Sequence, residues 1–215
     1  MIGTAAVVVL AVVAFAIFQP IQVLPRIRLA PGFALVDQSG ATVTSEDARG
    51  AVTLYTFAYA ACDEECDAIN ATMREVRDRV AGEVDFGDTP FRQVTISFDP
   101  ERDTPEALAV AAAGSGADGD SWLWASPDPS LLTTVVGAGF KAWYEPQPDG
   151  SFRFDPLFVL VDGWGVVRGE YRYQTVAGEA DKIVRHAGLL AEELRNSSGV
   201  ASLAYEAAHV FLCYP

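Results

Sequence analysis

The distribution of charged side chains is the feature that most limits what this chain can fold into. Residues 1–25 contain no ionisable side chain, and every charged residue of the 215-residue chain lies after them. Ile2–Phe18 has Thr4 as its only polar residue, and with its flank to Gln22 this stretch has the length of a bilayer-spanning helix, ~20 residues. The sequence therefore predicts one transmembrane helix, with residues 1–25 as a membrane anchor.

Two other interpretations of this apolar head remain open. A cleaved secretory signal would also be apolar, and Ala14–Ala16 has the small-x-small pattern of a cleavage site. A buried core helix is the other, although such helices are normally shorter or amphipathic. Arg26 and Arg28 follow the head and no basic residue precedes it, which by itself would place the body in the cytoplasm. Two arginines beside a large domain are weak evidence, so the orientation has to be argued from chemistry.

The remainder of the chain is acidic and has the size of one domain. It carries 29 Asp and Glu against 15 Lys and Arg, a net charge of −14, and the basic residues form no run. Such a surface repels phosphate backbones, so no nucleic-acid partner is expected. Half of the residues are hydrophobic, which excludes a disordered chain. We expect one domain with two appendages, divided as residues 1–25, 26–196 and 197–215.

Strand and helix patterns alternate along residues 26–196. The β-branched and aromatic run at 51–60 indicates a buried central strand, and it follows a hairpin pattern at 33–44. The patterns then predict a helix after Cys62 to about Val80, a strand at 91–98, a helix over Thr104–Ala113, a strand at 121–126, a helix near Ser130–Val136, a hairpin turn at Gln147–Gly150, two strands joined at Asp162–Gly165 and a helix over Ala177–Leu194. This order predicts an α/β, thioredoxin-like fold with a central mixed β-sheet flanked by helices.

Two cysteines carry the predicted chemistry. Cys62 and Cys66 form the motif CDEEC where the central strand meets the next helix. The free amide groups and dipole of a helix N-terminus favour a thiolate at Cys62, the form that attacks disulfides and binds soft metals. Cys66 lies one turn further on the same helix face. The acidic residues at 63–65 lessen this activation, and they argue against the alternative of two inert, buried cysteines.

Five motifs along the body carry a family resemblance. They are FALVDQSG, LYTFAYAACDEEC, VTISFDPERDTPEAL, KAWYE and FVLVDGWG, of which DPERDTPE at Asp99–Glu106 is the most specific. Over about Pro31–Asn196 this order resembles the Sco/SenC family of thioredoxin-fold proteins. Members of that family are membrane-anchored, face the periplasm or its equivalent, and help to assemble the dinuclear copper centre of cytochrome c oxidase as copper carriers or as thiol reductants. The resemblance implies an extracytoplasmic body and, as partner, the copper-bearing subunit of the oxidase or another respiratory subunit.

The sequence departs from the family pattern at the copper site. The family places its third copper ligand, a histidine, eleven residues before the glycine matched by Gly165, and that position is Phe154 here. A phenyl ring cannot coordinate copper, and the adjacent Asp155 offers a hard oxygen that suits Cu(I) poorly. The resemblance therefore implies a copper site with Cys62 and Cys66 as ligands that lacks its histidine.

The segment after Phe154 favours a different chemistry. Asp155–Asp162 resembles the proline-led strand of thioredoxin-like reductases, in which that proline is cis. A cis Pro156 would lie against the cysteine sulfurs and present backbone groups to a bound peptide. Cys62 would then attack a target disulfide, Cys66 would resolve the mixed disulfide, and Pro156 would shape the peptide groove. A trans proline that merely opens a strand is an equally good interpretation.

Other residues could supply a metal donor. His186 falls in the last predicted helix, where a solvated or packed position is the simpler expectation. His209 and Cys213 lie four residues apart in the tail and could form half of a metal site on one helix face. For residues 197–215 we prefer a helical tail whose apolar face packs on the domain, the bilayer surface or a partner subunit.

Other functional classes fit poorly. A peroxiredoxin needs a threonine where Tyr59 stands, three residues before Cys62, and the chain has neither a glycine-rich phosphate loop nor a GxSxG motif. The acidic residues Asp99, Glu101, Asp103 and Glu106 could attract a cation, but acidic residues that open a helix usually complement its dipole.

Three functions remain as hypotheses. The first is a membrane-anchored Sco-like protein that delivers copper to the oxidase or reduces its cysteines. The second is a thiol-disulfide oxidoreductase of thioredoxin type without copper, so the sequence leaves open whether the protein is an enzyme. The third is a non-catalytic accessory subunit of a respiratory complex, held by its anchor and its apolar tail.

Overall fold

The computed structural model describes residues 22–62, 64–172 and 179–196, and residues 202, 205, 206, 208 and 209. Its strands are β1 (Arg28–Leu29), β2 (Ala34–Asp37), β3 (Thr42–Thr44), β4 (Val52–Ala58), β5 (Phe91–Ser97), β6 (Trp122–Pro127), β7 (Tyr144–Pro146), β8 (Phe152–Phe154), β9 (Leu157–Val161) and β10 (Val166–Arg172). Its helices are α2 (Glu64–Glu83), α3 (Pro105–Ser115) and α4 (Glu179–Arg195), with a 3-10 turn η1 (Pro129–Leu131) and a π-helical segment η2 (Thr133–Gly139).

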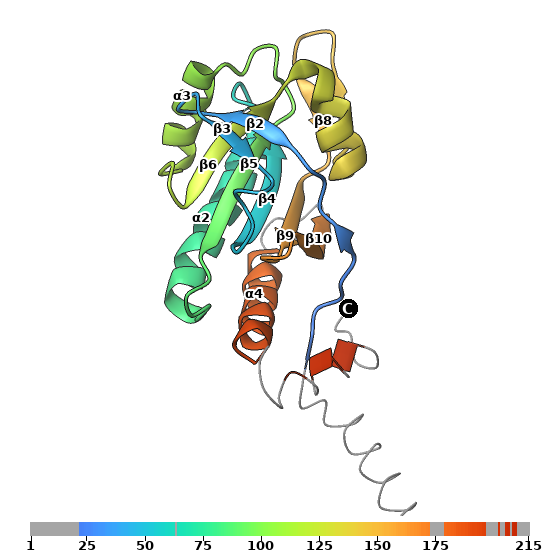
Figure 1. Cartoon of the computed structure of the whole chain (residues 1–215). Coiled ribbons are helices and arrows are strands. Elements are labelled where there is room, and N and C mark those ends of the chain that lie inside the picture. The colour runs from blue at the N-terminus through green and yellow to red at the C-terminus, as the bar shows by residue number, and fades with distance from the viewer. Residues whose placement is uncertain are drawn as a thin grey trace, which may run out of the picture.

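A mixed sheet forms the centre of the domain (Figure 1). The strand order is β1-β10-β9-β4-β5-β6-β2-β3, while β7 and β8 form a separate hairpin. β4, β5 and β6 run parallel to one another, and β9 pairs antiparallel with β4. The predicted α/β, thioredoxin-like fold is confirmed in this arrangement. Because parallel strands end at the same edge, the loops after β4 and β5 lie next to each other, and they carry the CDEEC and DPERDTPE motifs.

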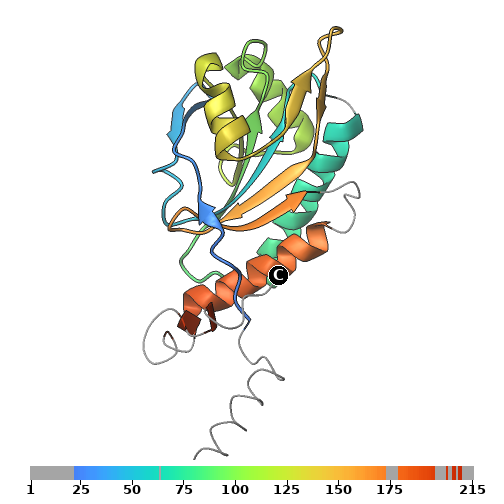
Figure 2. The same cartoon turned by 90° about the vertical axis from the view of Figure 1, so that its right-hand side faces the viewer.

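The two faces of the sheet are covered by different elements. α2 and α4 contact each other along one face, and η2 covers the opposite face (Figure 2). β4 is buried along its whole length, as a strand covered on both faces must be. Its Tyr55 and Phe57 rings lie 5.0 and 5.2 Å from the ring of Phe140 on the η2 side. Toward α2, the Gln93 side-chain amide donates to the Met73 carbonyl at 2.9 Å.

Capping residues determine where α3 starts and ends, and the start of α3 positions the loop after β5. The hydroxyl of Thr104 accepts from the Ala107 N–H at 3.4 Å, and Pro105 is the first helical residue. Gly116 ends the helix with φ +86°, a left-handed conformation that glycine adopts at little cost. α3 therefore begins two residues after Asp103.

The structure differs from the sequence-based expectations in two places. The helix expected near Ser130–Val136 is divided into η1 and η2. Two glycines, Gly137 and Gly139, reduce the helix propensity of this stretch, and the Phe140 N–H donates to the Val135 carbonyl across a wider turn. The short edge strand β1 was not expected. It pairs with β10 and leads the chain out of the domain toward the N-terminus.

The predicted membrane anchor lies almost entirely outside the described residues. Of residues 1–25, the structure describes only the last four. Among the described residues, no helix is both long and apolar enough to cross a bilayer. The transmembrane helix thus stays a prediction.

Candidate functional site

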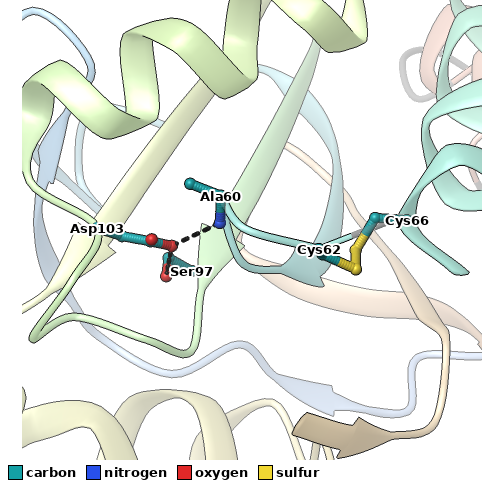
Figure 3. The surroundings of a disulfide bond; sticks show 5 residues. All are labelled: Ala60, Cys62, Cys66, Ser97 and Asp103. Carbon is teal, nitrogen blue, oxygen red and sulfur yellow. Dashed lines mark hydrogen bonds between the residues drawn. A yellow bond between two sulfur atoms is a disulfide. The ribbon is translucent and has the colours of Figure 1, made fainter. Parts of the chain in front are cut away.

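The two cysteines of the CDEEC motif lie where β4 leads into α2. The Cys62 N–H donates to the Tyr59 carbonyl at 3.2 Å, which closes a turn directly after the strand, and Cys66 lies in the first turn of α2. Their Cα atoms are 5.7 Å apart and their sulfurs are joined in a disulfide (Figure 3). The sequence thus predicted the position of the pair, and the structure describes its oxidised form.

The two cysteines differ in their exposure. Cys66 is 2% exposed and belongs to the hydrophobic core, whereas Cys62 is only partly buried. Glu64 and Asp67, on either side of Cys66, are exposed. An approaching thiolate therefore reaches Cys62 more readily than Cys66. The acidic side chains at this helix start favour a partner without a large negative charge.

A buried carboxylate lies behind the cysteine loop. Asp103 is 4% exposed, and its Oδ2 accepts from the Ala60 N–H at 2.9 Å and from the Ser97 hydroxyl at 2.6 Å (Figure 3). The Ser97 hydroxyl oxygen in turn accepts from the Asp99 N–H at 2.9 Å. Burial raises the pKa of the Asp103 carboxyl, and the hydrogen bonds from Ser97 and Ala60 partly oppose this rise. The end of β5 is thereby connected to the loop that carries Cys62.

An aromatic cluster covers the other side of this loop. The ring of Phe154, which is 8% exposed, lies 6.3 Å from the Tyr59 ring and 5.0 Å from the Phe98 ring. Phe152 contacts the same two rings at 5.1 and 5.2 Å. At the position that the sequence resemblance assigns to the family's histidine, the structure therefore has a buried hydrocarbon ring near the start of the cysteine loop. Phe154 cannot donate to copper there, and the described residues include no group of three His, Cys, Asp or Glu side chains placed to hold a metal.

Pro156 lies between β8 and β9, and its peptide bond is trans, as are all those of the described residues. The strand that it opens pairs with β4, and the Thr56 hydroxyl donates to the Leu157 carbonyl at 3.0 Å. This geometry is that of the trans alternative, a proline that opens a strand. The role of Pro156 in a peptide groove stays a prediction.

His186 is a core residue. It is 4% exposed, and its Nδ1 is 2.9 Å from the hydroxyl of Tyr171 on β10. Desolvation, together with smaller effects of the nearby Lys182 and Arg185, lowers the pKa of His186 to about 4. The imidazole is therefore neutral at pH 7 and lies on the packed face of α4.

The described residues of the tail contact the domain. His209 Nε2 is 2.9 Å from Glu193 Oε1, Glu206 pairs with Arg26 at 2.7 Å, and the Asn196 amide donates to the Tyr205 hydroxyl at 3.2 Å. His209 is thus in contact with a carboxylate of α4. Cys213, its predicted partner in a half-site, lies outside the described residues.

A buried ion cluster joins the same region to the core. Arg168 on β10 pairs with Asp162 at 3.0 Å and with Glu193 at 2.6 Å, with side-chain exposures of 2%, 4% and 11%. Its guanidinium also donates to the carbonyls of Leu24 and Pro25 at 2.9 and 3.2 Å. The cluster fixes the segment that leads toward the predicted anchor. No local sequence pattern indicates this cluster, because its members are far apart in the chain.

The acidic residues of the DPERDTPE loop do not gather around one point. Asp99 forms an ion pair with Arg102, and Asp103 turns to the cysteine loop. Glu106 lies in the first turn of α3, where hydrogen bonds from its own N–H and from Thr104 lower its pKa. The position of Glu106 agrees with the interpretation of a helix-dipole complement. The link from Asp103 to Ala60 was missed, since the sequence offered as a signal only a polar residue ending a buried strand, Ser97.

Comparison with known proteins agrees with this geometry. The family described as SCO1/SenC matches residues 23–187. The SCO1 protein homolog of Bacillus subtilis is 29% identical over 141 residues, which are 65% of this chain and 71% of that protein.

Two solved structures share the fold. One is BsSco, described as a member of the Sco family of cytochrome c oxidase assembly proteins in which a disulfide switch was identified. It aligns with a TM-score of 0.65 and 24% identity, and the alignment covers 78% of this chain and 96% of that chain. The other is Arabidopsis thaliana ScoI with copper bound, with a TM-score of 0.63 and 18% identity over 74% of this chain and 97% of that chain. The family match spans the sheet, the cysteine pair and the loop after β5, and the chain therefore belongs to the SCO1/SenC family.

Proposed function

We propose that this chain is a membrane-anchored Sco-like protein that serves the assembly of the copper centre of cytochrome c oxidase, and that it acts there as a thiol reductant. One observation carries the choice of chemistry. Cys62 and Cys66 form a disulfide at an accessible strand end, whereas Phe154 packs among other rings at the position of the histidine ligand. The family match and the likeness to BsSco, for which a disulfide switch and oxidase assembly are described, support a role in assembly of the oxidase.

Reduction of a target disulfide by this pair has two steps. In the first, the Cys62 thiolate attacks one target sulfur, a mixed disulfide forms and one target thiolate leaves. In the second, the Cys66 thiolate attacks the Cys62 sulfur, and the other target thiolate leaves. Two electrons pass to the target, whose thiolates take up the two protons that the pair has lost. A dithiol reductant protein then has to reduce the Cys62–Cys66 disulfide before the next cycle.

The burial of the two cysteines supports this order of events. Cys62 is the more accessible residue, and Cys66 is enclosed by the core at 2% exposure. A large target can therefore be attacked from Cys62 but not from Cys66. Cys66 can still reach the Cys62 sulfur, since the two are already within bonding distance in the oxidised form.

The test uses the reduced full chain in mild detergent and, as target, the disulfide-bonded copper-binding domain of the oxidase. A Cys213→Ser background removes the third cysteine. We expect two target thiols for each Cys62–Cys66 disulfide formed. Cys66→Ser should accumulate the mixed disulfide, and Cys62→Ser should not. No gain of target thiols, or equal trapping by both variants, would contradict the proposed function.

Copper delivery is a second candidate, favoured by the copper-bound relative. The reduced Cys62 and Cys66 would offer two soft sulfur ligands to Cu(I) as cargo, and a third donor would have to come from the partner. A Cu(I) titration of the reduced chain against a competing chelator tests this, with Cys62→Ala and Cys66→Ala as controls. Tight one-to-one binding that both substitutions abolish would support a copper carrier, and weak binding would leave reduction alone.

The proposal also includes the location of the domain. Residues 1–25 would form a single membrane span and place the body outside the cytoplasm, where a structural or catalytic disulfide persists. Protease added to spheroplasts should then digest the body without lysis. Protection from the protease until the membrane is opened would place the body in the cytoplasm instead.

A further inference from the structure

The loop between β4 and α2 is held from two sides. On one side, the Tyr59 ring packs on Phe98 at 5.4 Å and on Phe152 at 5.1 Å. On the other, the Ala60 N–H donates to Asp103 at 2.9 Å. The next hydrogen bond along the chain closes the turn from Tyr59 to Cys62. The backbone position of Cys62 therefore depends on what holds residues 59 and 60.

The Asp103 anchor is itself fixed to rigid elements. Its Oδ2 accepts from Ser97, the last residue of β5, which is fully buried. Its own N–H donates to the Asp99 carbonyl at 2.9 Å, and Thr104 directly after it caps α3. Strand pairing places Ser97, and the turn from Asp99 and the capped start of α3 place the backbone of Asp103. The carboxylate can thus transmit the position of β5 and α3 to the cysteine loop.

Burying the Asp103 carboxylate at this position costs free energy of solvation, which suggests that the carboxylate has a function there. At 4% exposure, Asp103 loses most of its hydration, and burial raises its pKa. A neutral side chain could fill the same space without this penalty. The charge strengthens a hydrogen bond to a backbone N–H, and here that N–H lies two residues before Cys62.

We propose that Asp103 is a positioning residue for the cysteine pair: through the Ala60 N–H it holds the loop so that Cys62 stays in bonding position relative to Cys66. This deepens the proposed thiol-reductant function and rests on it. With Asp103 holding the loop in the reduced form as well, closing the disulfide would cost the loop little conformational freedom. Without the anchor, the reduced loop gains freedom and the disulfide becomes easier to reduce.

The test measures the thiol-disulfide equilibrium of the full chain against dithiothreitol, in the Cys213→Ser background. Asp103→Ala should shift this equilibrium about tenfold toward the dithiol, the effect of losing one charge-assisted hydrogen bond, which equals about 30 mV in reduction potential. Asp103→Asn keeps a neutral acceptor for Ala60 and should shift the equilibrium by about threefold, less than Asp103→Ala, since a neutral hydrogen bond retains part of the energy of the charge-assisted one. Thr104→Ala is the matched control, because it removes the neighbouring helix cap but makes no contact with Ala60.

Each outcome decides the proposal. A shift in Asp103→Ala that Asp103→Asn partly rescues and Thr104→Ala lacks supports positioning. An equal shift in Asp103→Asn would show that the charge acts and the position does not, and an equal shift in Thr104→Ala would show general loosening of the loop; both overturn the proposal. The equilibrium with dithiothreitol is measured without the oxidase domain, so it tests the positioning role separately from the proposed function. If the wild type fails to reduce the oxidase domain while the variants still shift, the proposed function fails and the positioning role stands.

A second measurement needs no substitution, in case Asp103→Ala does not fold. The amide resonance of Ala60 in the oxidised wild type should change with pH as Asp103 titrates, above the usual range for an aspartate. The nearby charges that share this titration are Asp99 and Arg102. Ala60 should follow the same midpoint as the Asp103 carboxyl carbon. An Ala60 resonance that does not respond would overturn the proposal.

Discussion

The neutral, buried His186 should make the stability of the domain depend on pH. In the unfolded chain a histidine has a pKa of 6.5, and in the folded domain burial lowers it to about 4. Between these two values the unfolded chain binds a proton at His186 and the folded chain does not. Stability from this group is therefore complete above pH 6.5 and is lost as the pH falls toward 4.

The size of the effect follows from the two pKa values. One pKa unit corresponds to about 1.4 kcal/mol, so the full loss is about 3 kcal/mol. Between pH 7 and pH 5 about 2 kcal/mol of it should be visible in the free energy of unfolding. Protonation would also change the 2.9 Å contact between His186 Nδ1 and the Tyr171 hydroxyl, whose own pKa is raised by burial.

Urea unfolding of the full chain, followed by tryptophan fluorescence at both pH values, measures this loss. His186→Gln retains a hydrogen-bonding group for Tyr171 but cannot titrate, so its loss between pH 7 and pH 5 should be smaller by about 2 kcal/mol than that of the wild type. His209→Gln removes the other histidine and should leave the dependence on His186 in place. Equal losses in the wild type and His186→Gln would refute the reasoning, as would a loss that disappears only in His209→Gln.

Three further predictions concern the site and the core. Phe154→His should raise the affinity of the reduced chain for Cu(I) by about tenfold or more in a chelator competition, since it supplies an imidazole donor; an unchanged affinity would mean that residue 154 cannot reach the sulfurs. Arg168→Met should lower the free energy of unfolding by roughly 3–5 kcal/mol, because it leaves the buried Asp162 and Glu193 without their cation, whereas Arg26→Ala at the surface should cost about 1 kcal/mol or less. Since the raised pKa of Asp103 removes stability as the pH rises, the stability of Asp103→Asn relative to the wild type should increase from pH 4 to pH 7 in the same unfolding assay.

The parts of the fold that the sequence predicted are those that local patterns determine. The run at 51–60 is apolar on both faces because β4 is covered on both, and CDEEC follows it directly, so the cysteine pair could be placed at a strand end. Thr104 and Pro105 are local helix signals, and α3 starts where they predict. The helix expected near Ser130–Val136 is divided into η1 and η2, and the two glycines of η2, Gly137 and Gly139, lie beyond the predicted end and were not considered in that prediction.

What the sequence could not predict depends on contacts between distant residues. Asp103 and Ala60 are 43 positions apart, and only the pairing of β4 with β5 brings them together. The Arg168 cluster likewise joins Leu24, β10 and α4, and no spacing along the chain indicates it. In both cases the sequence shows the residue types but not their partners. Without a partner, an acidic residue near a helix start is explained by the helix dipole, and an arginine in a strand by an exposed position.

The two supports of the cysteine loop, the aromatic packing of Tyr59 and the hydrogen bond from Ala60 to Asp103, bear differently on the two candidate functions. Copper binding by the family pattern needs a donor at residue 154, and Phe154 removes it while its ring still packs on Tyr59. Disulfide chemistry needs Cys62 and Cys66 at bonding distance, which the packing of Tyr59 and the Asp103 hydrogen bond to Ala60 maintain. Phe154 thus supplies no copper ligand but supports the loop through Tyr59. Because Phe154 contacts Tyr59 and Asp103 contacts the adjacent Ala60, the effects of Phe154→His and Asp103→Ala on the thiol-disulfide equilibrium should be coupled, and the double variant should depart from the sum of the two single shifts.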